Sequence, residues 1–412
     1  MRSDLDRLMG EAKVDGLWVS GNLFNNPDMV YLTGIHHVNQ ADLFKLNGHD
    51  PILFHFVDME REEAEKTGLE TESYFAQSPL ADYIDKAGGD MPIAIAMRIK
   101  EAMQSCGLTS GTVAISGRVD LAPQHAILAQ LKVLLPKMHF TSFYKDGPFL
   151  AARMTKDQDE IAQIRAMGKL TTEVIGRVKH FLQSSAVKDG QLMRADGAPL
   201  TVGDVKSRIN LWLAELGAEN PEDAIFAIGR DGGIPHSSGS PDDVITLGQP
   251  IVFDIFPCQS GGGYFYDITR TWCLGYAPKA VQTLYEQVLE VHHILIDHLK
   301  PHTPFKNYQA MACDLFEKNG HVTIAQDRTT RAGYLHSIGH GLGLDVHEKP
   351  FSGFTAAPDD ILIPGVVFTI EPGLYYPDQG MGVRIEDTIY VNEQGQFVII
   401  AEYPYDLVIP VG

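Results

Sequence analysis

Cysteine is scarce in this sequence: only four occur among 412 residues, and they are not paired at the spacing of a zinc site or a small disulfide scaffold. We therefore expect reduced and mostly buried thiols. Long apolar runs are also missing, because none approaches the roughly 18 residues that a membrane helix needs. The first residues, Met1 to Asp6, mix charges where a secretory signal would need an uninterrupted apolar stretch. These absences exclude a membrane span and favour a cytoplasmic protein.

Basic residues are in deficit, since 33 Lys and Arg stand against 53 Asp and Glu and give a formal net charge of −20. Such a charge repels a phosphate backbone, which excludes nucleic acid as a partner. In other respects the composition is that of a globular protein, with 44% hydrophobic and 21% charged residues. A chain of this length exceeds what one hydrophobic core usually holds, so we expect two domains.

The first 150 residues alternate short apolar runs with helical patterns. Residues 16–19, 51–54 and 112–115 have the length and composition of strands, whereas residues 97–108 have the spacing of a helix. Alternation of this kind is typical of layered folds with helices packed on a sheet. The sequence therefore predicts an α/β domain over residues 1–150.

Long helices are predicted in the remaining part, residues 151–412. Thr155 to Gln158 has the form of a capping box, so a helix should start there. Two later helices are bounded by Gly217, which should end one, and by Pro278, which should open the other. The apolar residues that recur every three to four positions in these helices lie within 161–181, 205–216 and 281–295.

Strand-like runs alternate with these helices at 251–256, 264–272, 366–371 and 382–391. The pattern predicts an α+β domain in which helices pack on one face of a largely antiparallel sheet. The runs also echo one another. Asp254 precedes an Asp-Ile-Thr motif at Asp267 by 13 residues, and Glu371 precedes a Glu-Asp-Thr motif at Glu386 by 15 residues. Each pair is predicted to form a hairpin that carries two carboxylates, and a duplicated half-domain is a hypothesis.

The acids in these runs lie where burial is expected. Asp254 interrupts an apolar strand and Glu371 ends another, although a buried carboxylate without a partner is costly. Strand alternation allows Asp267 and Glu386 to converge on the same cleft. Four converging carboxylates repel one another at low dielectric, and a pair of divalent cations relieves that repulsion.

Ion pairing within the protein is the alternative explanation for the four acids. Arg270 and Arg384 are the nearby cations, and two positive charges do not balance four negative ones. A cluster of histidines adds to the metal interpretation. His336, His340 and His347 fall within twelve residues, among glycines that let the backbone approach closely. The segment is therefore predicted to belong to a metal site.

The predicted donors are rich in oxygen and include one imidazole, which favours Mn²⁺ or Co²⁺ while Zn²⁺ stays possible. Two such ions about 3.5 to 4 Å apart can share a bridging water, lower its pKa and polarise a carbonyl. The sequence thus predicts hydrolytic chemistry at a centre of two divalent ions.

The order of these motifs resembles that of a known family. The motifs are Asp254, Asp267-Ile268-Thr269-Arg270, His336 to His340-Gly341-Leu342-Gly343, His347-Glu348, Thr369-Ile370-Glu371-Pro372-Gly373 and Arg384-Ile385-Glu386-Asp387. From about Arg153 onward the chain resembles the pita-bread metallopeptidases, in particular the proline-selective branch with aminopeptidase P and Xaa-Pro dipeptidase (prolidase). Tyr31-Leu32-Thr33-Gly34 resembles a short motif of the creatinase-type N-terminal domain.

The resemblance implies roles for the metal ligands. Asp254 would chelate one ion, and Asp267 and Glu386 would bridge the two. His340 and Glu371 would hold the second ion, and Glu371 would also take the proton from the bridging water.

Other residues would form the substrate pocket. His347 would support the substrate carbonyl, and His236 and His336 match the other pocket histidines. Arg384 would orient Glu386 or contact the substrate. Twelve residues separate the two aspartates of the first hairpin, a longer loop than the family usually has, and the run Gly261-Gly262-Gly263 is predicted to absorb the difference.

The implied activity is hydrolysis of the Xaa-Pro bond, at the N-terminus of peptides or in dipeptides, by attack of a metal-bridging water. The partners would be peptides with proline at the second position, and the assembly would be a homodimer or homotetramer. Two alternatives stay open: another metal-dependent hydrolase or lyase on the same fold, and a non-catalytic binding member. The complete set of ligands counts against the binding member.

Overall fold

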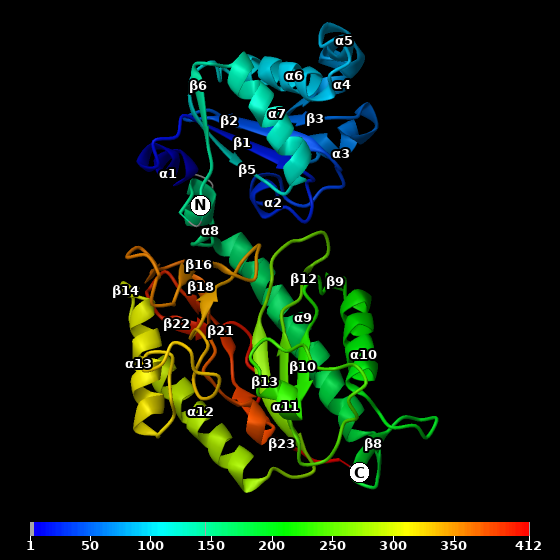
Figure 1. Cartoon of the computed structure of the whole chain (residues 1–412), viewed down its shortest axis with the longest axis vertical. Helices are drawn as coiled ribbons and strands as arrows, with labels where there is room; N and C mark the ends of the chain where they lie inside the picture. Colours follow the sequence, from blue (N-terminus) through cyan, green and yellow to red (C-terminus); the bar gives the residue numbers. More distant parts are fainter. Residues whose placement is uncertain (1–3, 145, 412) are drawn as a thin grey trace. The chain divides into compact units, whose positions relative to one another are not determined.

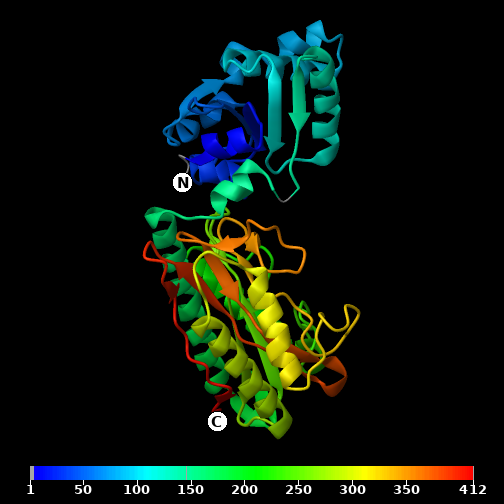
Figure 2. The same ribbon diagram turned by 90° about the vertical axis from the view of Figure 1, so that its left-hand side faces the viewer.

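The computed structural model describes residues 4–144 and 146–411. The chain divides into two compact units (Figure 1, Figure 2). The first contains residues 1–153 together with the short segment 261–263, and the second contains residues 154–260 and 264–412. No helix in the described part of the chain is long and apolar enough to cross a lipid bilayer.

A six-stranded mixed sheet forms the centre of the first unit, with strand order β4-β3-β2-β1-β5-β6. Strand β2 pairs antiparallel with both of its neighbours, whereas β1 with β5, β5 with β6, and β3 with β4 are parallel pairs. Parallel neighbours need crossover connections, and helices supply them here. The strands are β1 (Gly16–Gly21), β2 (Ala41–Leu46), β3 (Ile52–His55), β4 (Glu70–Ser73), β5 (Gly111–Ser116) and β6 (Met138–Thr141). The main helices are α1 (Leu5–Glu11), α2 (Pro27–Thr33), α5 (Leu80–Lys86), α6 (Met91–Ser105), α7 (Leu121–Leu134) and α8 (Pro148–Arg153), and α3 (Arg61–Glu65) and α4 (Tyr74–Gln77) are short.

The core of the first unit joins this sheet to its helices. Trp18 of β1 and Phe44 of β2 are fully buried and pack with Met103 of α6 and Leu131 of α7. The α/β fold predicted for the N-terminal part is confirmed.

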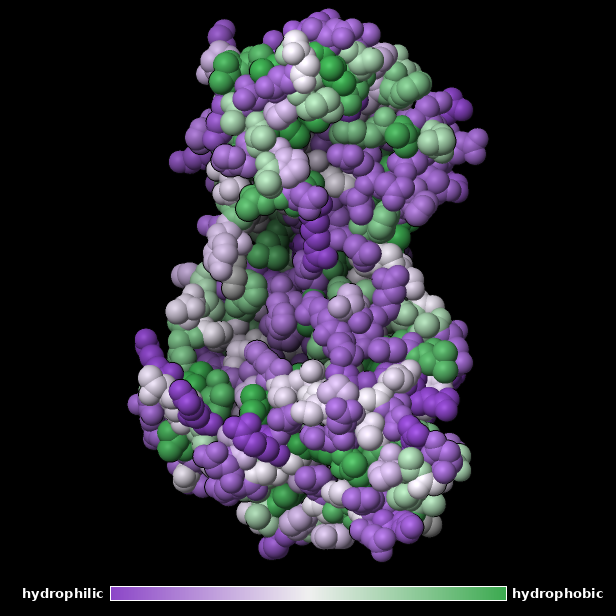
Figure 3. Space-filling view, turned by 45° about the vertical axis from the view of Figure 1, so that its right-hand side comes forward, coloured by the Kyte–Doolittle hydropathy of each residue, from purple (hydrophilic) through white to green (hydrophobic). Residues whose placement is uncertain are grey.

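On the face shown in Figure 3, hydrophilic and hydrophobic residues are interspersed, which is ordinary for a protein surface.

Four long helices organise the second unit: α9 (Gln158–Gln183), α10 (Val202–Glu215), α12 (Lys279–Asp297) and α13 (Lys306–Lys318). In Figure 1, α9 and α10 lie on the side of β10 and β13, and α12 and α13 lie on the side of β18 and β21. The predicted helix boundaries at Gly217 and Pro278 are confirmed: Gly217 follows the end of α10 with φ of 76°, and Pro278 is the N-cap of α12.

The start of α9 differs from the prediction. Thr155 forms a β-bridge, and the Lys156 N–H donates to the Gly365 carbonyl at 2.8 Å, so both residues are held against the sheet. The cap is therefore Asp157, whose carboxylate accepts from the Glu160 N–H at 3.0 Å while the Glu160 carboxylate accepts from the Asp157 N–H at 2.7 Å. The capping box exists, two residues later than predicted.

The second unit contains two principal sheets, with strand orders β10-β11-β13-β23 and β16-β15-β18-β21-β22. Their pairings are antiparallel except between β13 and β23, which confirms the α+β prediction, although the strands form two principal sheets. The strands of the first are β10 (Ile225–Ile228), β11 (Pro250–Ile255), β13 (Ile268–Leu274) and β23 (Val408–Ile409). Those of the second are β15 (His340–Gly341), β16 (Glu348–Phe351), β18 (Val367–Ile370), β21 (Asp387–Val391) and β22 (Phe397–Ile399).

The predicted run 382–391 is divided into β20 (Met381–Arg384) and β21, and β20 pairs with β19 (Gly373–Tyr376). The break falls at Ile385 and Glu386. The N–H of Ile385 donates to the Pro372 carbonyl and that of Glu386 donates to the Thr269 carbonyl, so the chain changes partners at this point. This change of partners places Glu386 between two strands, next to the other acids.

Candidate active site

The four carboxylates come from two hairpins of the second unit. Asp254 lies in β11 and is paired in register with Thr269 of β13, and Asp267 directly precedes β13. Glu371 directly follows β18, and Glu386 directly precedes β21, with which β18 pairs antiparallel. The echo in the sequence therefore corresponds to two hairpins that each carry a pair of acids.

Threonine hydroxyls join the two hairpins reciprocally. Thr269 Oγ1 donates to Glu386 Oε2 at 2.7 Å, and Thr388 Oγ1 donates to the backbone carbonyl of Asp267 at 2.6 Å. In each motif, the threonine two residues after the acid thus contacts the acidic residue of the other motif. This geometry is a reason for the repeated threonine, while the duplicated half-domain stays a hypothesis.

His340 reaches the acids from β15, which lies between β16 and β18. Glycine permits this close approach: a Cβ atom on Gly339 would lie 2.0 Å from the Thr369 carbonyl oxygen, and one on Gly341 would lie 2.0 Å from the Lys349 carbonyl oxygen. The flanking strands can therefore close on the histidine only because no side chain intervenes.

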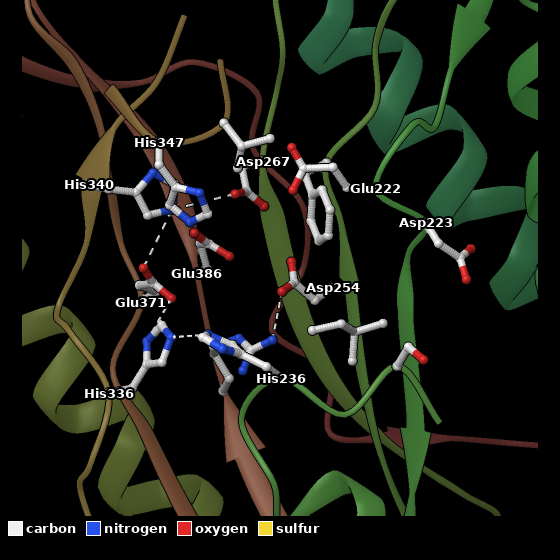
Figure 4. Close-up of a pocket in the computed structure, with 15 residues that line it drawn as sticks. Glu222, Asp223, His236, Asp254, Asp267, His336, His340, His347, Glu371 and Glu386 are labelled. Atoms are coloured by element: carbon white, nitrogen blue, oxygen red, sulfur yellow. Dashed lines mark hydrogen bonds and ion pairs between the residues drawn. The ribbon is translucent and has the colours of Figure 1, made fainter. Parts of the chain in front are cut away.

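Figure 4 shows that the acids and His340 converge on one space. Ligand atoms of Asp267, His340 and Glu386 all lie within 4.8 Å of one another. His340 Nε2 is 3.7 Å from Asp267 Oδ2 and 3.6 Å from Glu371 Oε1. Together with Asp254, these residues are at most 7% exposed.

The chemistry of this cluster fits divalent cations. One carboxylate oxygen each of Asp254, Asp267, Glu371 and Glu386 is buried without a hydrogen-bond partner. Burial and the neighbouring carboxylates raise the pKa of Asp267 and of Glu386, and burial raises the pKa of Glu371 to about 8. Buried carboxylates left uncompensated are costly, and oxygen donors with an imidazole are ligands for divalent metal ions.

Arg384, one of the two arginines considered as counterions, binds an acid of the cluster. Arg384 Nη2 donates to Asp254 Oδ2 at 2.6 Å, and its other N–H groups donate to Thr269 Oγ1, the Pro235 carbonyl and the Tyr375 hydroxyl. The guanidinium is thus committed to Asp254, and Glu386 receives its hydrogen bond from Thr269.

Arg270 forms an ion pair with an acid outside the cluster. Its Nη2 donates to Asp387 Oδ1 at 2.8 Å, and its Nη1 donates to the Glu386 backbone carbonyl at 2.7 Å. Of these two arginines, Arg384 alone faces the four carboxylates, which leaves a larger charge imbalance than the sequence indicates.

Three more histidines surround the acids. His336 Nδ1 lies 3.2 Å from Glu371 Oε2, and its Nε2 lies 2.8 Å from His236 Nε2. Burial lowers the pKa of His336 to about 4 and also lowers that of His236, so both rings are neutral at pH 7. A neutral His336 that carries its proton on Nδ1 must accept at Nε2, so His236 is the donor of that pair. The ring of His347 lies against that of His340, with centroids 4.4 Å apart.

All nine residues proposed from the sequence line one cavity of about 250 Å³. Its remaining lining residues are Glu222, Asp223, Ile225, Ser238, Phe256 and Val346. None of these six stood out in the sequence. Glu222 and Asp223 belong to a polar turn before β10, and nothing in their spacing relates them to the metal motifs.

Relatives of known sequence match part of the chain. The chain is 30% identical over 257 residues to the probable dipeptidase PepE of Mycobacterium tuberculosis, a match that covers 62% of this chain and 61% of the relative. It is 33% identical over 193 residues to the Xaa-Pro dipeptidase of Pyrococcus furiosus, covering 47% of this chain and 51% of that one. The matched part is therefore less than two thirds of either relative.

Solved structures show the same fold over the whole chain. A dipeptidase from Pyrococcus horikoshii aligns with a TM-score of 0.75 at 23% identity, covering 99% of both chains. An X-Pro aminopeptidase from Thermotoga maritima aligns with a TM-score of 0.73 at 22% identity, again covering 99% of both. The predicted pita-bread catalytic fold with an N-terminal α/β domain is confirmed.

The family follows from the catalytic part of the chain. Residues 162–393, more than half of the sequence, match the model of one peptidase family. That range includes every one of the nine residues proposed for the site. The chain belongs to metallopeptidase family M24.

Proposed function

We propose that this protein is an exopeptidase that hydrolyses the bond before proline, in Xaa-Pro dipeptides or at the N-terminus of longer peptides. The cluster of buried carboxylate oxygens without hydrogen-bond partners is the observation that supports the proposal most. Relatives named as Xaa-Pro dipeptidase and X-Pro aminopeptidase support the choice of proline.

The proposed centre holds two divalent ions through Asp254, Asp267, His340, Glu371 and Glu386. When bound, such ions supply a water of lowered pKa and polarise the carbonyl of the scissile bond. The oxygen-rich donors favour Mn²⁺, with Co²⁺ or Zn²⁺ as alternatives. On the family resemblance, the proposal includes a cytoplasmic homodimer or homotetramer.

The protein's own groups have distinct proposed roles. Glu371 is the proposed proton acceptor, because one of its oxygens is buried without a hydrogen-bond partner while the other lies 3.2 Å from His336 Nδ1. His347 is exposed at the cavity and can donate a hydrogen bond to the substrate carbonyl. His236 holds the ring of His336, and Arg384 fixes Asp254.

The apolar part of the cavity suits proline. An Xaa-Pro amide has no N–H for a peptidase to bind, so recognition must come from the ring. Ile225, Phe256 and Val346 supply apolar lining for a rigid pyrrolidine that loses little entropy on binding.

The test compares Ala-Pro with Ala-Ala, and Ala-Pro-Ala with Ala-Ala-Ala, using protein loaded with Mn²⁺. We expect cleavage of the proline peptides at least about tenfold faster, as expected when an apolar pocket selects its side chain. Asp267→Asn serves as the control that weakens the centre and should abolish the activity.

Equal rates on the alanine peptides would overturn proline specificity and leave a general metallopeptidase. If the metal-loaded protein cleaved none of the four peptides, another metal-dependent reaction or a binding role would replace the proposal. The pair of peptide lengths also decides between dipeptidase and aminopeptidase action.

A further inference from the structure

Two adjacent acids at the cavity, Glu222 and Asp223, lie outside the ligand cluster. Glu222 follows Pro221 in the turn before β10 and lines the cavity that Asp267 and His347 also line. Figure 4 shows its carboxylate turned toward the side where Asp267 and His347 lie, while the neighbouring Asp223 points away. The two adjacent acids therefore differ in what they present to a bound molecule.

The two acids also differ in their partners. Asp223 Oδ2 pairs with Lys206 Nζ at 2.5 Å, and its Oδ1 accepts from the Ala224 N–H at 2.9 Å. Glu222 is exposed and has no hydrogen bond or ion pair within residues 4–144 and 146–411. The charge of Asp223 is compensated, whereas that of Glu222 is open to a ligand.

No lysine or arginine among the described lining residues is left to neutralise Glu222, and His347 is the histidine that interacts electrostatically with it. Arg384 is the one lysine or arginine among the described lining residues, and Asp254 and three further acceptors occupy its guanidinium. An uncompensated carboxylate at a cavity attracts a cationic group of the bound molecule.

An exposed carboxylate at the cavity suits a side chain with a long aliphatic stem and a cationic end, which describes lysine and arginine. In Xaa-Pro dipeptides, the α-amino group and the carboxylate of proline are common to all members. The side chain of the first residue is thus the group that Glu222 can discriminate.

We propose that Glu222 is a specificity-determining residue that favours Lys-Pro and Arg-Pro over Xaa-Pro substrates with uncharged or acidic first residues, an inference that rests on the proposed function. Because Glu222 is exposed, the attraction is partly screened by water and salt. We expect a preference of roughly two- to fivefold in kcat/KM, the range of an exposed ion pair.

The experiment measures kcat/KM for Lys-Pro, Met-Pro and Glu-Pro with the Mn²⁺-loaded full chain. Lysine and methionine have similar lengths, so their ratio isolates the charge. In the unchanged protein the Lys-Pro to Met-Pro ratio should be about two to five, and Glu-Pro should be the poorest substrate. Glu222→Gln should bring the ratio to about one, and Glu222→Lys should reverse the order of Lys-Pro and Glu-Pro.

Asp223→Asn is the matched control, because it removes an acid of the same turn that Lys206 already compensates. Its ratio should remain at the value of the unchanged protein, and added salt should lower the ratio only where Glu222 is present. Thermal unfolding of each variant checks that the turn still folds.

The outcomes separate the two proposals. Cleavage of all three dipeptides with a Lys-Pro to Met-Pro ratio of one or less, or with a ratio that Glu222→Gln leaves unchanged, overturns the role of Glu222 alone. Failure to cleave any of the three overturns the proposed function and this inference with it.

Discussion

At the scale of residues, the two buried arginines have separate tasks. Arg384 binds Asp254 inside the cavity, whereas Arg270 binds Asp387 and the backbone carbonyls of Thr269 and Glu386. Burial alone would raise the pKa of Asp387, but Arg270 and His292 hold it below its ordinary value. Arg270 thus keeps a buried carboxylate ionised and fixes the backbone from which Glu386 projects.

The change Arg270→Met tests this role. It leaves the Asp387 charge buried without its main partner, which should lower the free energy of unfolding by about 3 to 5 kcal/mol. Denaturant unfolding at pH 7.5 measures the effect. The control is Arg177→Met, which removes partly exposed ion pairs to Glu173 and Glu215 and should cost less than about 1 kcal/mol.

A loss of similar size in both variants would mean that the buried pair contributes no more than a surface pair. Asp387→Asn in the same protein gives a second check, because it removes the charge that Arg270 neutralises. The double change should then cost less than the sum of the single changes.

At the scale of elements, the alternation of side chains along a strand explains why the burial of Asp254 could be predicted from the sequence. It also explains why Arg270 does not serve the four acids. The position of Asp254 within an apolar run correctly predicts a buried acid, because a strand with such neighbours has little exposed surface. The sequence suggests Arg270 as a counterion of the four acids. It follows Thr269 directly in β13, so it points to the opposite face of the strand from a residue that contacts Glu386.

Other features of the site depend on contacts between distant segments. The break between β20 and β21 arises because Glu386 pairs with the backbone of Thr269, 117 positions earlier, and no local pattern encodes that pairing. Glu222 enters the cavity from a polar turn that resembles any surface turn in the sequence. Motif order in the sequence supplied the proposed ligands, whereas the cavity wall also contains residues that belong to no motif.

The glycine segment of β15 supports a prediction about packing. A Cβ atom on Gly341 would lie 2.0 Å from the Lys349 carbonyl oxygen and 2.2 Å from its carbon, both backbone atoms that cannot rotate away. Gly341→Ala should therefore separate β15 from β16 and lower the free energy of unfolding by about 3 kcal/mol or more. Gly353→Ala is the control from the same region, because nothing lies within 4 Å of its added Cβ.

Denaturant unfolding of the two variants measures the difference. Gly353→Ala should stay within about 0.5 kcal/mol of the unchanged protein, as expected for a change without contacts. If Gly341→Ala were equally neutral, β15 would have to move without loss, and close packing around His340 would not explain the glycines.

At the scale of the whole molecule, each of the two units has its own hydrophobic core. The first is built around Trp18 and Phe44 on the six-stranded sheet, and the second joins α12 and α13 to β18, β20 and β21. All five proposed metal ligands belong to the second unit. A ligand stabilises only the folded unit that binds it, so metal should act on one unit and spare the other.

Calorimetry with and without metal tests this division of stability. Without ions, the four clustered carboxylates of the cavity have Arg384 as the guanidinium that faces them among the described lining residues. The folded second unit then loses the free energy of metal binding. At an ion concentration about 100 times the dissociation constant, that loss is about 2.7 kcal/mol, which corresponds to a shift in Tm of about 5 to 10 °C for a unit of this size. We expect two transitions, of which only the one assigned to the second unit moves down on chelation and returns with Mn²⁺. Asp267→Asn should remove most of the shift, because it takes one ligand from the centre. Equal movement of both transitions would show that the units unfold together. If a chelator changed neither transition, the proposal that this site binds divalent ions would be wrong.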